Sequence, residues 1–474
     1  MAENFTGILP ENLNWIAAII IVIIVLATVL LLMKEGVDAT KVTVTGAIIV
    51  SILYLFLVHD WKTGFEENLS YTEVPEHFLE ALSRTVNIEA ILIIFSVSII
   101  VAITKGAGFF DFISLSLVKL TKGDPRKLMI ALGGLTFFVS MFFDNLSAII
   151  LLGSLTVVIC RQLELRIRPF VLFVGINTII GGLPTPVSSL PNIIFFNLLE
   201  PTTLSGNMNF IIFMAYMLPI ALLFFGLATA FFFFIYRKDI LIEVSDEKKE
   251  QLSRINPWSG IENRKDIWKS LILLGTLFVG FLLTSIPGNP LDIALIALIV
   301  TIFGVFLFRK DLKRYLEDGV EWEMIVFFIA LFVLMGMLTA SGALQPLNTI
   351  LTGVIGATPT ISGQILVALI IGAVGLPITG FLNGSSAALI FSYIFQSLPQ
   401  GITAGLWIGF VLSGNIGGAL TPLGSITILM ALEILNREGE PMSFFQYLKR
   451  MLPLTLTLGI LSIGYSMFLI AVFG

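Results

Sequence analysis

The sequence contains very little cysteine, histidine or charge. Its 474 residues include one cysteine, Cys160, and two histidines. A single thiol cannot form an internal disulfide or supply a cysteine-rich metal site, so the sequence disfavours a metalloenzyme. We find no nucleophile paired with a base, and an enzyme is therefore not predicted. Charged residues make up 12% of the chain and hydrophobic residues 57%, which is typical of a protein with many membrane spans.

The net charge and the N-terminal segment argue against two further interpretations, a nucleic-acid-binding protein and a cleaved signal peptide. The net charge is −5, and Lys and Arg do not cluster with aromatic residues, so nucleic-acid binding is not predicted. Residues 1–14 have no basic stretch and precede an apolar run of about 20 residues, which indicates a first span and not a cleaved signal. The sequence suggests no cofactor other than a sodium ion.

A polar tip interrupts an apolar run at residues 141–148. The tip reads Met-Phe-Phe-Asp-Asn-Leu-Ser-Ala, and the apolar arms beside it extend over about residues 128–160. At 1.5 Å per residue each arm is roughly 20–24 Å long, whereas a spanning helix must cover ~30 Å. Because Lys and Arg flank both ends, we predict a re-entrant hairpin that begins and ends in the cytoplasm. One kinked helix with a buried polar cluster is the alternative.

The segment that follows is longer than one span and is interrupted by Gly, Pro and Ser. Pro184 and Pro186 cannot both continue a helix, so residues 169–199 are predicted to form a broken span with an unwound centre near the hairpin tip. The second half repeats this order. A second hairpin is predicted at about 363–398, with its tip at 383–386, and a second broken span at 401–435.

The other spans complete an all-α polytopic membrane protein. They are predicted at 15–33, 42–58, 88–104, 209–236, 270–285, 293–308, 324–340 and 452–473, with an interfacial helix at 109–120. The Lys and Arg distribution places both termini outside a cell membrane, inner or plasma. We therefore predict two inverted repeats, residues 1–236 and 270–474, joined by a cytoplasmic linker at 237–269. Each repeat has five spans, one of them broken, plus one hairpin, a pattern typical of secondary transporters with a site at the repeat interface.

Small polar residues gather at the hairpin tips and the breaks. Helix N-termini that meet there offer unpaired N–H groups and partial positive charge, which favours anions or hydroxylated neutral solutes. The candidate binding residues are Asn145, Ser147, Asn177, Thr185, Ser188, Ser189, Asn383, Ser385, Ser386, Asn415, Thr421 and Ser425. Asn145 and Asn383 are also the candidate ligands of a sodium ion. The alternative for each residue is a structural role as the cap of a buried helix end.

Asp144 is the only acid at a hairpin tip. A carboxylate at mid-membrane depth is costly and is a candidate proton or sodium carrier. We therefore predict that Asp144 binds the coupling ion. Glu89 and Glu323 each open a predicted helix, where a carboxylate complements the helix dipole, so a structural role is predicted for both.

Three stretches carry a resemblance to a known superfamily. Residues 143–147 (Phe-Asp-Asn-Leu-Ser) resemble the hairpin tip of P permeases and sodium/proton antiporters. Residues 421–426 (Thr-Pro-Leu-Gly-Ser-Ile) resemble a stretch of arsenite permeases, and residues 320–334 resemble the P-permease entry to the second half. The chain thus resembles the ion-transporter superfamily, which also includes citrate carriers. The resemblance implies a scaffold domain, a transport domain that carries both hairpins, an elevator-type movement and often a homodimer.

The predicted function is secondary active transport of a small inorganic solute, arsenite-like or another oxyanion, coupled to protons or sodium. Where antiporters commonly have Ile-Gly-Asp, this chain has Val-Ser-Ser at 187–189 and Leu-Gly-Ser at 423–425, which removes negative charge from the site. One cysteine cannot form a thiol-based arsenite site. A sodium/proton antiporter, a di- or tricarboxylate symporter and a channel are the alternatives.

Overall fold

The computed structural model describes most of the chain as helices. The described residues are 15–32, 38–54, 86–197, 208–240, 256–258, 261, 263–289, 291–308, 313, 315–320, 322–340, 349–350, 353–355, 360–382, 384–396, 398 and 402–473. The helices of the first half are α2 (Trp15–Leu32), α3 (Ala39–Leu53), α6 (Ile88–Gly106), α7 (Phe109–Thr121), α8 (Pro125–Ser140), α9 (Asn145–Gln162), α10 (Ile167–Gly181), α11 (Leu190–Asn197), α12 (Phe210–Ile235) and α13 (Arg237–Ile240). Those of the second half are α15 (Arg264–Leu283), α16 (Ile293–Phe308), the π-helical turn η2 (Tyr315–Gly319), α18 (Trp322–Ala340), α20 (Ile361–Leu382), α21 (Gly384–Gln396), α22 (Ala404–Ile416), the 3-10 turns η3 (Gly417–Ala419) and η4 (Pro422–Gly424), α23 (Ile426–Arg437) and α24 (Phe444–Phe473).

The same order of elements occurs in both halves. A long helix (α6 or α18) is followed by a helix pair (α8 and α9, or α20 and α21), then by an interrupted helix (α10 and α11, or α22 and α23) and a final long helix (α12 or α24). The first helix pair is set by its caps, since the side chain of Asp124 caps α8, Pro125 occupies its first turn, and Asp144 caps α9. The prediction of an all-α polytopic membrane fold is confirmed.

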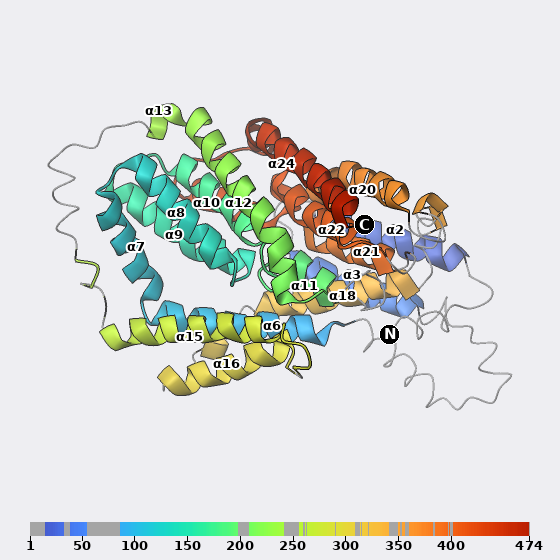
Figure 1. Cartoon of the computed structure of the whole chain (residues 1–474), viewed down its shortest axis with the longest axis horizontal. Helices are drawn as coiled ribbons and strands as arrows, with labels where there is room; N and C mark the ends of the chain where they lie inside the picture. Colours follow the sequence, from blue (N-terminus) through green and yellow to red (C-terminus); the bar gives the residue numbers. More distant parts are fainter. Residues whose placement is uncertain are drawn as a thin grey trace.

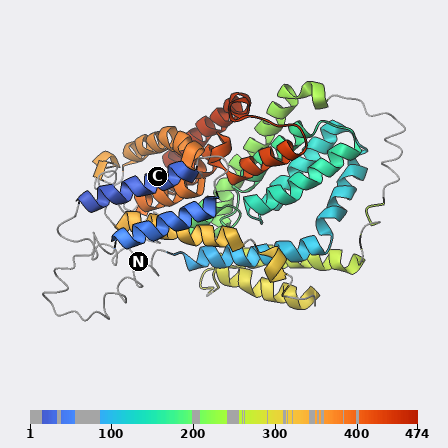
Figure 2. The ribbon, with the colours of Figure 1, turned by 180° about the vertical axis from the view of Figure 1, so that it is seen from behind.

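The helices form two groups that meet at the centre of the molecule. In Figure 1, α8, α9 and α10 lie on the left, α20, α22 and α24 on the right, and α6, α15 and α16 along the bottom. The two halves are interleaved, because α23 of the second half packs against α9 and α10 of the first, as the view from behind shows (Figure 2). The interruptions in the helices therefore come together between the two groups.

Several element boundaries differ from the predicted ones. The last helix begins at Phe444 and not at 452, and it continues through Pro453. The predicted linker at 237–269 contains the short helix α13 and the first turn of α15. Among the described residues, six helices are long and apolar enough to cross a membrane: α6, α9, α12, α15, α20 and α24. The arm that becomes α9 is thus longer than predicted, because the polar tip residues from Asn145 onward belong to the helix.

Glycine lets each interrupted helix approach its hairpin closely. A Cβ added at Gly181 would lie 2.6 Å from the Cα of Phe137 in α8, and one at Gly417 would lie 2.7 Å from the carbonyl oxygen of Leu376 in α20. These are contacts with backbone atoms, which cannot rotate away. Both halves therefore use the first glycine of a Gly-Gly pair for the same helix-to-helix contact.

We expect Gly181→Ala to destabilise the protein by about 1–3 kcal/mol, the usual cost of overpacking a core. Thermal unfolding in detergent measures the change. The matched control is Gly134→Ala in α8, where a Cβ would meet no atom within 4 Å and alanine favours the helix by up to about 1 kcal/mol. Equal unfolding temperatures for the two variants would show that the close approach of α10 to α8 is not required.

Candidate functional site

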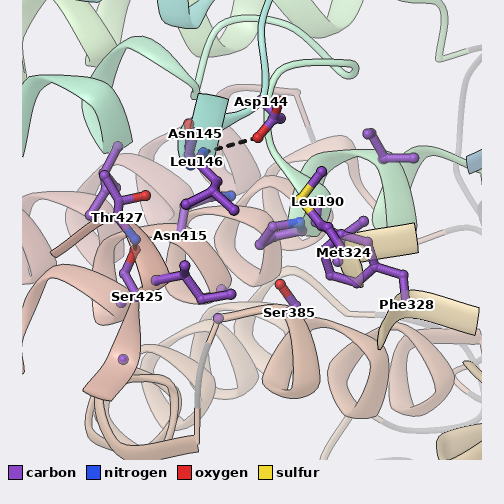
Figure 3. A pocket seen from close by; sticks show the side chains of 18 of the residues that line it. Asp144, Asn145, Leu146, Leu190, Met324, Phe328, Ser385, Asn415, Ser425 and Thr427 are labelled. Carbon is purple, nitrogen blue, oxygen red and sulfur yellow. Dashed lines mark hydrogen bonds between the residues drawn. The ribbon is translucent and has the colours of Figure 1, made fainter. Parts of the chain in front are cut away.

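A cavity lies where the interrupted helices and the hairpin tips meet. Its volume is about 80 Å³, on a measure by which one water molecule needs roughly 10–15 Å³, so it admits several waters or one small solute. Asp144, Asn145, Ser385, Asn415 and Ser425 all line it (Figure 3). These five predicted site residues come from four different helices and both halves of the chain.

Four helix N-termini point at this cavity. Its lining includes the first residues of α9 (Asn145, Leu146), α11 (Leu190, Pro191), α21 (Gly384, Ser385) and α23 (Ile426, Thr427). Each N-terminus carries about half a positive charge, so four together supply roughly two elementary charges. That exceeds the single negative charge of an ionised Asp144, the only carboxylate among the described residues of the lining. The electrostatics of the cavity therefore favour an anion.

The opposite helix ends are satisfied by protein groups. The hydroxyl of Thr185 donates to the carbonyl of Met141 at the end of α8, and the hydroxyl of Thr421 donates to the carbonyl of Gly380 in α20. The side-chain amide of Asn192 donates to the carbonyls of Gly182, Leu183 and Thr185 beyond the end of α10. Because these carbonyls already accept hydrogen bonds, the partial negative charge that they present is reduced. The partial positive charge of the N-termini that face the cavity is therefore not cancelled by nearby helix C-termini.

Asp144 caps α9 from the wall of the cavity. Its Oδ1 accepts hydrogen bonds from the backbone N–H groups of Leu146 and Ser147, both at 3.0 Å. The bond to Leu146 is visible in Figure 3. The carboxylate therefore stabilises the helix start and at the same time lines the cavity.

Asn145, next to it, presents an unused acceptor. Its Oδ1 is buried and has no hydrogen-bond partner among the described residues. The same holds for the hydroxyl oxygen of Ser386 at the start of α21. Buried polar atoms are nearly always satisfied in folded proteins, so the Asn145 oxygen, which lines the cavity, is a candidate contact for a bound ion, solute or water. Asn383, the other predicted sodium ligand, lies outside the described residues.

Asn415 joins the two halves of the chain at the cavity wall. Its Nδ2 donates to Oδ1 of Asn192 at 2.7 Å and to the carbonyl of Val411 at 2.9 Å, and its Oδ1 accepts from the hydroxyl of Ser189 at 2.8 Å. The three side chains are buried. Asn415 thus holds α11 against α22 and fixes the shape of the wall.

The remaining predicted residues lie outside the cavity lining. Ser147 and Ser386 follow the tips on α9 and α21, and Thr185 and Thr421 face the hairpin carbonyls described above. Ser188 donates to the carbonyls of Gly182 and Thr185 within the break. Asn177 donates to the carbonyl of Phe173 in its own helix, at 2.8 Å.

Several lining residues were not among the predicted ones. Thr427 follows the cap residue Ser425 by two positions. It is a polar residue just inside a helix that begins at a predicted interruption, a signal that the sequence did contain. Ile94 in α6 and Met324 and Phe328 in α18 form the apolar side of the cavity. Their side chains are apolar like their neighbours in the helix, so the sequence does not show that they face the cavity; packing brings α6 and α18 to this place.

A comparison with known protein families identifies the family of this chain. The family model described as CitMHS, citrate transporter, matches residues 13–413. The chain belongs to the CitMHS family. It is therefore a multi-pass membrane transporter, and the resemblance to the ion-transporter superfamily is confirmed.

Curated relatives cover nearly the whole chain. A protein named 46 kDa membrane protein from Mycobacterium leprae is 24% identical over 445 residues, which are 92% of this chain and 95% of that protein. An uncharacterized transporter of Mycobacterium tuberculosis is also 24% identical, over 89% of this chain and 91% of its own length. This CitMHS chain therefore matches these relatives over nearly the full length of both proteins.

A solved structure shares the fold. The YdaH transporter of Alcanivorax borkumensis, described as having an unusual topology, superimposes with a TM-score of 0.53 over 85% of this chain and 89% of its own, at 17% sequence identity. At this identity the likeness concerns the arrangement of helices alone.

Proposed function

We propose that this CitMHS chain is a secondary active transporter of a small, oxygen-rich anion. The observation that carries the proposal is the convergence of four helix N-termini on one cavity whose lining, among the described residues, has a single carboxylate and no Lys or Arg. A Lys or Arg in the lining would place a full charge in direct contact with the anion, whereas each helix end contributes only about half a charge through its N–H groups. Moderate attraction suits a site that must release its solute on the other side.

The coupling ion is a proton or a sodium ion that binds beside the solute. Asp144 supports either ion, because it is the only titratable group that the described residues contribute to the lining. The unpaired Oδ1 of Asn145 supports sodium, since a buried carbonyl oxygen without a donor is a suitable cation ligand. A cation bound here would also compensate the charge of the anion as both cross the membrane.

The solute class follows from the donors that line the cavity. The hydroxyls of Ser385, Ser425 and Thr427 suit the oxygens of an inorganic oxyanion, of arsenite through its hydroxyls, or of a carboxylate. The small volume favours an inorganic oxyanion, while the family description favours citrate or a related carboxylate. Sodium/proton antiport without any solute is the second candidate, and Asp144 is the observation that favours it.

Elevator-type movement is the proposed mechanism of alternating access. The helices that form the polar side of the cavity, α9, α11, α21 and α23, would move together against α6 and α18. The side chains that α6 and α18 contribute to the cavity are Ile94, Met324 and Phe328. An apolar wall makes no hydrogen bonds that would have to break during sliding, which supports movement along this surface.

A transport panel in proteoliposomes tests the function. We expect uptake of one anion class, among arsenite, inorganic oxyanions, citrate and dicarboxylates, only when an inward proton or sodium gradient is imposed. Vesicles without protein and vesicles with the gradient collapsed by an ionophore are the controls. Sodium/proton exchange with no added solute would establish the antiporter instead, and uptake that is independent of both gradients would indicate a channel.

A further inference from the structure

A second cavity lies at a different place in the fold, at the end of α12. Its volume is about 750 Å³, and it is bounded by the start of α10, the end of α12, α13 and α24. None of its lining residues takes part in the site between the hairpin tips. Five of them are cationic: Arg166, Arg168, Arg237, Lys238 and Arg450.

The acidic residues of this cavity do not balance the cationic ones. Its two acids are each engaged by one arginine, Asp239 by Arg166 at 3.1 Å and Glu440 by Arg168 at 3.8 Å. The carboxylate of Glu440 also accepts from the backbone N–H groups at the start of α10. Among the described residues the lining has five cations and two acids, a surplus of three positive charges. Arg237, Lys238 and Arg450 form no ion pair within this part of the chain.

Arg450 and Arg168 both donate hydrogen bonds to neutral groups that hold them in position, and Arg168 is also held by its ion pair with Glu440. Arg450 donates to the hydroxyl of Tyr236 at 3.2 Å, and its guanidinium lies over the Tyr236 ring, 5.0 Å from the centroid. Arg168 donates from Nη2 to the carbonyls of Glu440 and Pro441, and its buried Nε lies 3.8 Å from Oε2 of Glu440. Preorganised guanidinium groups with spare donors match the oxygens of a phosphate group.

The apolar residues of the lining connect this charged cavity to the membrane. α12 is a 26-residue apolar helix long enough to cross a bilayer, and the cavity includes its last residues, Phe234 and Ile235. The Phe234 side chain is 76% exposed, so in a bilayer it would contact acyl chains while the cations lie just beyond the helix end. Basic pockets between helices at a membrane surface bind the headgroups of anionic lipids.

We propose that this cavity binds the phosphate headgroup of an anionic phospholipid. Arg450, Arg237 and Lys238 contact the phosphate, Arg168 completes the wall, and Phe234 packs against an acyl chain. A soluble phosphate would make the same charge interactions but would not contact Phe234. This difference distinguishes a phospholipid headgroup from a free phosphate as the ligand. The lipid would join α10 to α13 and α24, since these helices supply the cationic residues.

The test measures lipid binding to the purified full-length protein. Native mass spectrometry and thermal unfolding in detergent are carried out with added phosphatidylglycerol, phosphatidylcholine, inorganic phosphate or glycerol 3-phosphate. We expect phosphatidylglycerol to remain bound and to raise the unfolding temperature. The variant Arg237→Gln/Lys238→Gln is expected to weaken its binding roughly 30-fold, from about fivefold per cation lost near a membrane surface.

The matched control is Lys119→Gln/Lys127→Gln, which removes the same charge from exposed residues outside the cavity. The control should bind phosphatidylglycerol as the unaltered protein does, and both double variants should unfold at nearly the same temperature without lipid. Equal weakening in the control would show diffuse attraction and overturn the site. Equal binding of phosphatidylcholine, or binding of inorganic phosphate or glycerol 3-phosphate as tight as that of phosphatidylglycerol, would overturn the lipid assignment.

Discussion

Replacing Asp144 with asparagine is expected to reduce gradient-driven uptake to the level of vesicles without protein, while the fold is retained. Asparagine can accept the same hydrogen bonds from Leu146 and Ser147, because Asn and Asp are equally good N-cap residues. The substitution therefore removes the ionisable group and keeps the cap. Uptake is measured in proteoliposomes under proton and sodium gradients, and folding by size-exclusion chromatography and thermal unfolding.

Asp124→Asn is the matched control for this experiment. Asp124 caps α8 in the same way, accepting from the N–H groups of Arg126 and Lys127, but it lies at the other end of the hairpin and outside the cavity. We expect the Asp124→Asn variant to show the same gradient-driven uptake as the unaltered protein. If Asp144→Asn kept the pH and sodium dependence of the unaltered protein, the coupling role would have to pass to another group, with Glu89 and Glu323 the next acids to test.

Asn415→Leu is expected to lower the free energy of unfolding by about 2–4 kcal/mol, because it leaves two buried polar atoms without their hydrogen-bond partner. Leucine has a similar volume, so the change in packing is small. Oδ1 of Asn192 loses a donor, and the hydroxyl of Ser189 loses an acceptor. Both partners lie in the other half of the chain, so the loss weakens the contact between the halves. Thermal unfolding in detergent measures the effect.

Asn177→Leu is the comparison that isolates this contact. Asn177 is also buried, but its amide donates only to the carbonyl of Phe173 in the same helix. That carbonyl is four residues away within α10 and is available to the helix backbone, so we expect a cost below about 1 kcal/mol. Equal costs for the two variants would mean that the bonds between the halves add nothing to the stability of the fold.

The interruptions of the helices could be predicted from the sequence because their causes are local. Pro184 and Pro186 cannot remain in a helix, and the polar tip at Asp144 has a strong N-cap residue in the middle of an apolar run. The structure has helix boundaries at these places, with α10 ending at Gly181 and α9 beginning at Asn145. The family resemblance of the tip was also visible in the residues themselves.

The roles of individual polar residues could not be predicted in the same way. A threonine before a proline looks the same whether it binds a solute or caps a neighbouring helix. In the structure, Thr185 and Thr421 donate to carbonyls of the hairpins, whereas Ser425 and Asn415 line the cavity. The difference depends on which helix packs beside each residue, and a single sequence does not encode that locally.

The sequence by itself determined the class of protein, the interruptions and the set of small polar residues, because composition and backbone preference act over a few neighbouring residues. Only the tertiary structure decided which of those residues meet. Asn415 bonds to side chains more than 220 positions earlier in the chain, and Met324 and Phe328 close the cavity from α18. Contacts at such separations depend on the packing of whole helices, since the energy that selects them comes from buried surfaces shared between distant segments.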